Sequence, residues 1–125
     1  YFAPSNSAPN PMSLYNLAPC RVLDTRSSQG PFQGQLTVDV INGPCAVPSS
    51  ATSYVLNATV VPPGGLGYLT LWPAGQGQPQ VSTLNAVDGA VTSNMAITPT
   101  LNGSIDAFAP NPTNLILDIA GCFAP

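Results

Sequence analysis

Alternation of apolar and polar residues recurs along most of the chain, and it constrains the fold more than any other feature of the sequence. A period of two is that of a β-strand, whose successive side chains point to opposite faces of a sheet. No stretch combines a 3.6-residue apolar period with helix caps. The alternating runs predict about eight short strands, at residues 20–26, 35–41, 52–61, 66–72, 81–85, 91–98, 104–109 and 114–121.

Turn-forming residues separate these runs. Residues 62–65 read Pro-Pro-Gly-Gly, and Pro73 and Gly75 close the run at 66–72. Short strands joined in this way are typical of an antiparallel β-sandwich of the Greek-key or jelly-roll type, with a closed barrel as the second interpretation. The 125 residues fit one domain, and 44% apolar residues suffice for a core. We therefore expect an all-β fold.

The first 19 residues differ from the rest because proline, serine and asparagine dominate them. Proline fixes φ and lacks an N–H donor, so residues 1–19 are predicted to be an extended arm or linker, ahead of a β-domain at 20–125. A purely solvated linker would not need large apolar side chains. Six are present and are candidates for contact with a partner: Tyr1, Phe2, Met12, Leu14, Tyr15 and Leu17.

Charged residues are scarce, and this excludes several functions. The chain has two Arg and five Asp, with no Lys, Glu or His, and a net charge of −3. It offers no basic patch for nucleic acid, and no apolar run is long enough for membrane insertion. Ser-His-Asp and Lys-based catalysis cannot be built. We therefore expect that the chain is not an enzyme and that it binds no cofactor. We also expect self-association, because so few charges produce little electrostatic repulsion between copies of the chain.

The three cysteines differ in their surroundings. Cys20 and Cys45 each lie beside a proline at a strand boundary, and a disulfide between them is predicted to stabilise the fold by roughly 3 kcal/mol. Cys122 is then left over. It is either a buried free thiol or the source of an intermolecular bridge.

Arg21, Asp24 and Arg26 lie close together in the first run. We interpret them as a structural ion-pair and hydrogen-bond hub, because the arginine fork can pair with carboxylates at two points. Binding of an acidic sugar is the alternative. Asp118 lies within the last run and is expected to face outward or to pair with Arg.

Tyr68 and Trp72 share one face of the run at 66–72, so they either stack on a sugar ligand or pack in the interior. Sugars could also be attached covalently, since two N-x-S/T sequons are present and the arm is rich in serine. The candidate glycosylation sites are Asn57, Asn102, Ser5 and Ser7.

The two ends of the chain resemble each other. It begins Tyr-Phe-Ala-Pro at residues 1–4 and ends Cys-Phe-Ala-Pro at 122–125. Such a match is expected where similar units follow one another.

A resemblance to a known family rests on five segments that occur in order. They are PCRVLDTR (19–26), GPCAVP (43–48), YVLNATVVPPGGLGYLTLWPAG (54–75), STLN (82–85) and LILDIAGCF (115–123). Together they resemble a repeat module of unknown function in secreted bacterial proteins, often in tandem or attached to cell-wall-associated enzymes. The resemblance implies an extracellular β-sandwich without established catalytic residues. Where this chain has Cys122, the module usually has Tyr in a terminal Gly-Tyr-Phe, which residues 1–2 resemble.

These observations favour an extracellular or cell-surface structural protein, one unit of a head-to-tail bacterial filament joined through the arm at 1–19. The alternative is a carbohydrate- or cell-wall-binding module of a larger secreted protein. The expected partners are other copies of the unit and glycans.

Overall fold

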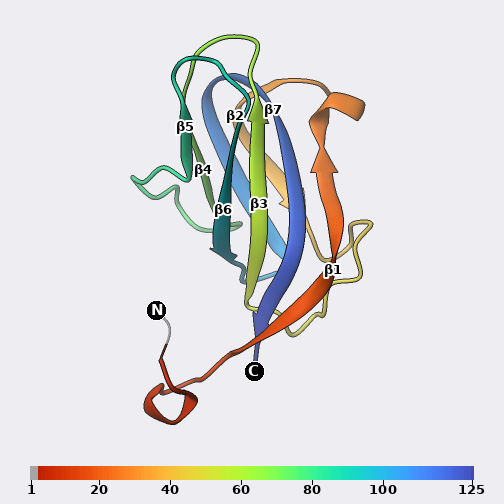
Figure 1. Cartoon of the computed structure of the whole chain (residues 1–125), viewed down its shortest axis with the longest axis vertical. Helices are drawn as coiled ribbons and strands as arrows, with labels where there is room; N and C mark the ends of the chain where they lie inside the picture. Colours follow the sequence, from red (N-terminus) through yellow and green to blue (C-terminus); the bar gives the residue numbers. More distant parts are fainter. Residues whose placement is uncertain (1–2) are drawn as a thin grey trace.

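The computed structural model describes residues 3–125 (Figure 1). The described residues form seven β-strands and two short 3-10 turns, without an α-helix. The turns are η1 (Ser5–Ser7) and η2 (Thr25–Ser27). The strands are β1 (Ser13–Asp24), β2 (Phe32–Asp39), β3 (Ser53–Val61), β4 (Leu66–Pro73), β5 (Leu84–Ala86), β6 (Thr92–Pro99) and β7 (Ser104–Ala124).

The long strand β7 organises the fold, because its two halves have different neighbours. Residues 104–109 lie between β2 and β4, and residues 114–124 lie between β1 and β3. β6 then pairs with β3, and β5 pairs with β4. Every pairing is antiparallel. Figure 1 shows β7 rising beside β2 and β4, turning at the top, and descending beside β1 and β3 to the C-terminus. One strand therefore belongs to two groups of strands that face each other.

The turn in β7 falls at Pro110, Asn111 and Pro112, where proline removes two backbone donors. Side chains take over the bonding there. The amide of Gln33 donates to the Pro110 carbonyl oxygen at 2.9 Å, and the Gly67 N–H donates to the Asn111 side-chain oxygen at 3.0 Å. The two strands that flank the first half of β7, β2 and β4, are thus both bonded to the turn.

The all-β antiparallel prediction is confirmed, with two differences in detail. The runs at 104–109 and 114–121 were expected as separate strands, but they are one strand because pairing resumes at Thr113, opposite Phe32. The structure therefore has seven strands. β1 also begins at Ser13, inside the range assigned to the arm, because residues 13–16 pair with residues 121–124.

The core lies between the two groups of strands. Alternate residues of β3 and both halves of β7 point inward and are buried. Burying a leucine-sized side chain contributes about 1.5–3 kcal/mol, so these positions determine which face of each strand turns inward. The most deeply buried side chains include Tyr54, Leu56, Val60, Leu66, Leu69, Ile105, Leu115, Leu117 and Ile119.

Candidate functional site

The N-terminal residues 3–12 lie apart from the strands. Figure 1 shows this segment beyond the end of the molecule where the C-terminus lies. Its hydrogen bonds among described residues stay within its own turn, where the Ser7 N–H and hydroxyl donate to the Pro4 carbonyl oxygen. Ala8 is half-buried, and the other side chains described in this segment are exposed. Within residues 3–125, no hydrogen bond joins this segment to the strands.

The predicted arm residues fall on both sides of the start of β1. Met12 precedes the strand and is 41% exposed, and Leu14 and Tyr15 within it are 55% and 46% exposed. Leu17 is half-buried against the core. Tyr1 and Phe2 lie outside the described residues. Large apolar side chains thus remain accessible where the segment joins the domain.

An apolar face continues from Leu14 across the outward side of β7, β3 and β6. We define the apolar face as Leu14, Val55, Met95 and Ile97. A Cβ on Gly121 would lie 3.4 Å from Leu14 Cδ1 and 3.8 Å from Val55 Cβ, so both side chains lie close to the glycine. Val55 also lies opposite Ile97. Met95 and Ile97 are 63% and 41% exposed.

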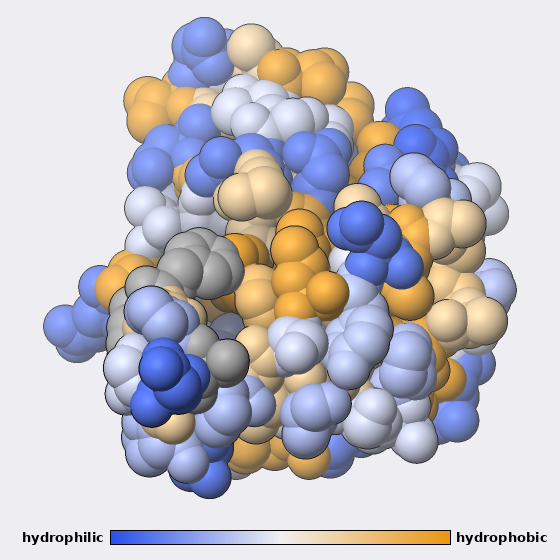
Figure 2. All heavy atoms as spheres, turned by 60° about the horizontal axis from the view of Figure 1, so that its bottom comes forward, coloured by the Kyte–Doolittle hydropathy of each residue, from blue (hydrophilic) through white to orange (hydrophobic). Residues whose placement is uncertain are grey.

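Figure 2 shows hydrophobic atoms gathered on this side of the molecule, bordered by hydrophilic ones. Isolated exposed apolar residues are normal on protein surfaces, but contiguous ones indicate a contact surface. The apolar face therefore offers the chemistry of a protein–protein contact.

The hub predicted at Arg21, Asp24 and Arg26 is present and includes Asp118. Arg21 binds Asp118 at two points, with Nε–Oδ1 at 2.9 Å and Nη2–Oδ2 at 3.3 Å. Arg26 binds Asp24 in the same way, at 3.0 and 2.9 Å. The hydrogen bond that Arg26 donates lowers the pKa of Asp24, and the hydrogen bond that Arg21 donates to Asp118 raises the pKa of Arg21. Both guanidinium groups are thus engaged by carboxylates of the same chain.

The predicted disulfide between Cys20 and Cys45 is present, with the two Cα atoms 5.9 Å apart. It ties β1 to the loop between β2 and β3. Cys122 is a free thiol, buried beside Tyr54 on the neighbouring strand β3. Burial raises the pKa of this thiol, which keeps it protonated and less reactive.

The candidate glycosylation sites have different surroundings. Asn57 is exposed on β3, where its amide donates to the Thr59 hydroxyl at 3.3 Å. Asn102 is exposed in the turn before β7, and its side-chain oxygen accepts from the Ser104 N–H at 3.0 Å. Ser7 is exposed within η1. Ser5 belongs to the same turn, and its side chain is outside the described part of the structure.

The two aromatic candidates on β4 separate clearly. Trp72 is 3% exposed and donates its indole N–H to the Gln76 carbonyl oxygen at 3.0 Å, so it packs beneath the loop at 74–83. Tyr68 is half-buried and forms a near-parallel pair with Phe108 of β7, with ring centroids 6.0 Å apart. The structure thus leaves Tyr68 as the aromatic residue of β4 that can meet a ligand.

Two features at this surface were not anticipated. Phe108 could have been found from the alternation of residues 104–109, which places Asp106 and Phe108 on the face opposite Ile105 and Ala107. The pocket beside Tyr68 carries no comparable signal, because a polar loop forms it.

A comparison with protein-family models found no match, and comparisons with curated proteins and solved structures found no significant match. Within residues 3–125, no cluster of three or more potential metal-ligating side chains occurs. No helix in the same range is long and apolar enough to cross a membrane.

Proposed function

We propose that the chain is an extracellular structural protein, a β-sandwich unit of a bacterial surface filament that joins other units head to tail through its N-terminal arm. The observation that carries the proposal is the position of residues 3–12, which stand apart from the strands and lead through Met12 into exposed apolar residues of β1. Exposed Met, Leu and Tyr side chains gain free energy when a neighbour covers them. A disulfide is compatible with an oxidising, extracellular compartment.

The reach of the segment supports contact with a second unit. An extended chain spans at most about 3.3–3.6 Å per residue, so residues 3–12 can extend roughly 33–36 Å. That distance is comparable to a complete strand of 9–11 residues. A segment of this length can lie along the surface of a neighbouring domain.

The apolar face of Leu14, Val55, Met95 and Ile97 is the surface we assign to receive this segment from the next unit. The surrounding surface carries few charges, so two units approach with little repulsion. Donor segment and acceptor face are different surfaces, and a contact between different surfaces that does not close into a ring generates a filament.

Removing residues 1–11 tests the proposal. The truncation leaves the paired strand at 13–24 intact, so we expect an unchanged circular dichroism spectrum and melting temperature. Negative-stain microscopy and light scattering should show filaments for the full chain and monomers for the truncated one. Filaments from the truncated chain, or none from the full chain, would contradict the proposal.

Point variants separate the acceptor face from general surface hydrophobicity. Ile97→Asp places a charge on the apolar face and should block assembly. Leu101→Asp is the matched control, because Leu101 is 69% exposed in the turn before β7, outside that face. It should assemble as the full chain does, and equal loss in both variants would refute the assignment of the face.

A further inference from the structure

The outward side of β4 and the first half of β7 presents a second surface, unlike the apolar face. Tyr68 and Phe108 are both half-buried there, with their ring planes 26° apart. The loop at 74–83 covers the next outward residues of β4, since the Thr70 hydroxyl donates to the Val81 carbonyl oxygen at 2.6 Å. The loop stops short of the Tyr68 ring. The Tyr68 ring is thus accessible, whereas the neighbouring outward residues of β4 lie under the loop.

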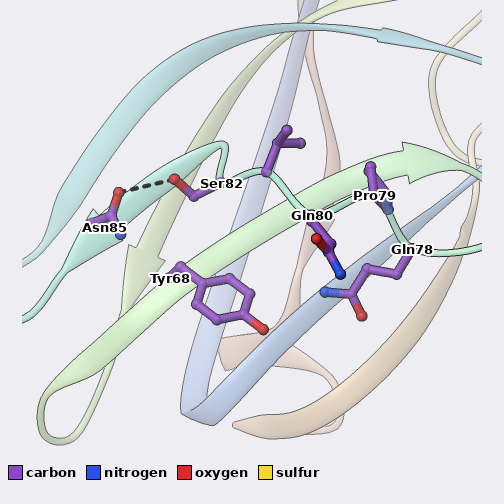
Figure 3. Close-up of a pocket in the computed structure, with 7 residues that line it drawn as sticks. Tyr68, Gln78, Pro79, Gln80, Ser82 and Asn85 are labelled. Atoms are coloured by element: carbon purple, nitrogen blue, oxygen red, sulfur yellow. Dashed lines mark hydrogen bonds between the residues drawn. The ribbon is translucent and has the colours of Figure 1, made fainter.

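An open pocket of about 610 Å³ lies between Tyr68 and the loop. Its polar lining comes from Gln78, Gln80, Ser82 and Asn85. Figure 3 shows the Tyr68 ring and the side-chain amides of Gln78 and Gln80 turned toward the same space. This volume lies within the range of pockets that hold small ligands.

Part of the lining is fixed and part is free. Asn85 is held by Ser82, whose hydroxyl donates to its side-chain oxygen at 3.1 Å, and it donates to the Gly67 carbonyl oxygen at 2.8 Å. Gln78 and Gln80 make no side-chain hydrogen bond to another described residue. Each amide offers two donors and an accepting oxygen. The free amides can therefore bind groups that both donate and accept.

The pocket is uncharged. No Arg or Asp lines it, and the nearby Asp106 is buried and accepts from the Thr37 hydroxyl at 2.6 Å and the Gln35 amide at 3.1 Å. An anionic ligand would find no cation here, and a cationic one no free carboxylate. The ligand that fits is neutral, with hydroxyl groups at its edge and an apolar C–H face for the aromatic ring.

We propose that Tyr68, Gln78 and Gln80 form a binding site for a neutral saccharide. The sugar ring lies against Tyr68, and its hydroxyls bond the two glutamine amides. The peptide of residues 3–12 also carries hydroxyl and amide groups, so it is tested below as the competing occupant. The site lies outside the apolar face and does not depend on assembly through the arm.

Affinity electrophoresis of the full chain through gels containing xylan, mannan, a mixed-linkage β-glucan or an α-glucan tests this site. We expect retardation by at least one of these neutral polysaccharides. Tyr68→Ala should abolish it, Tyr68→Phe should retain it because the ring remains, and Gln80→Ala should weaken binding about three- to tenfold through the loss of hydrogen bonds. Val87→Ala is the control outside the pocket and should bind as the full chain does.

Circular dichroism of each variant shows whether it folds. If no neutral polysaccharide retards the protein, or if Tyr68→Ala folds and binds as before, the proposal is overturned. Retardation by anionic polygalacturonate alone would overturn it as well. A synthetic peptide of residues 3–12 that binds the chain and loses binding in Tyr68→Ala would assign the pocket to the arm of a neighbouring unit instead.

Discussion

Each half of β7 carries an aspartate on its outward face, and the two aspartates are held differently. Asp118 in the second half is one-third exposed and pairs with Arg21. Asp106 in the first half is 3% exposed and is held by the neutral donors of Gln35 and Thr37. A chain with two arginines cannot pair every carboxylate. The comparison teaches that hydroxyl and amide donors alone can satisfy a buried carboxyl group in this fold.

The surroundings of the two halves follow the same division. The second half lies between β1 and β3, beside the apolar face and the disulfide. The first half lies between β2 and β4, beside the uncharged polar pocket. One half of a single strand thus supports a surface suited to protein contact, and the other a surface suited to a polar ligand.

The largest effect is expected from the disulfide, which acts on the second half. Replacing Cys20 and Cys45 together by Ala should lower the free energy of unfolding by about 3 kcal/mol, because the unfolded chain is no longer constrained. Urea unfolding measures the loss. Hydrogen exchange should show weaker protection in β1 and residues 116–119 than in residues 104–109. Equal loss in both halves would show that they are one cooperative unit.

Removing the buried carboxylate should come next in size. Asp106→Ala removes the acceptor of two hydrogen bonds at a buried position and is expected to cost about 2 kcal/mol. Chemical unfolding against the full chain gives the value, with Thr37→Val as a partner variant that removes only one of the two donors. If Asp106→Ala lowered the free energy of unfolding less than Asp118→Ala does, the buried aspartate would contribute less than the exposed one, contrary to this prediction.

The exposed pair on the second half should contribute less. Asp118→Asn or Arg21→Gln is expected to lower the free energy of unfolding less than Asp106→Ala does, because solvent and salt screen exposed ion pairs. The difference from the full chain should shrink further in 1 M NaCl. A loss that salt leaves unchanged would show that packing, rather than charge, is what the pair provides.

The smallest expected effect is the contribution of Asp24 to the loss of stability at low pH. Because Arg26 lowers the pKa of Asp24 in the folded state, this carboxylate stabilises the fold above the ordinary carboxyl pKa of about 4, and the contribution disappears as the pH falls through the lowered value. Melting temperatures from pH 6 to pH 2 should therefore fall more steeply for the full chain than for Asp24→Asn. Parallel curves would mean that Asp24 has a similar pKa in the folded and unfolded states.

Strand alternation predicted most of this fold because the two faces of each strand differ so strongly. Residues 52–61 show this well, with Tyr54, Leu56 and Val60 all buried. The sequence could not show that residues 104–121 form one strand, since prolines usually end strands. Here hydrogen bonds of the Gln33 and Asn111 side chains take the place of the backbone hydrogen bonds that the prolines cannot make.

The candidate sites were predicted less completely. The disulfide and the arginine hub follow from residue type and spacing, since few alternative partners exist. The pocket depends on how the loop at 74–83 folds back over β4, which brings Gln80 to Tyr68 on the preceding strand. Such loop positions have no periodic pattern to reveal them.

The antiparallel pairing of β1 with β7 has a mechanical consequence. A force on residues 3–12, directed along β1 away from the far end of the domain, pulls the strand parallel to its neighbour. The rungs of the ladder are then sheared together rather than opened one at a time. Extension from this end also stops at Cys20, because the covalent link to Cys45 transfers the load to the loop before β3. Tension applied at residues 3–12 would therefore be carried by the β1–β7 ladder and then by the disulfide.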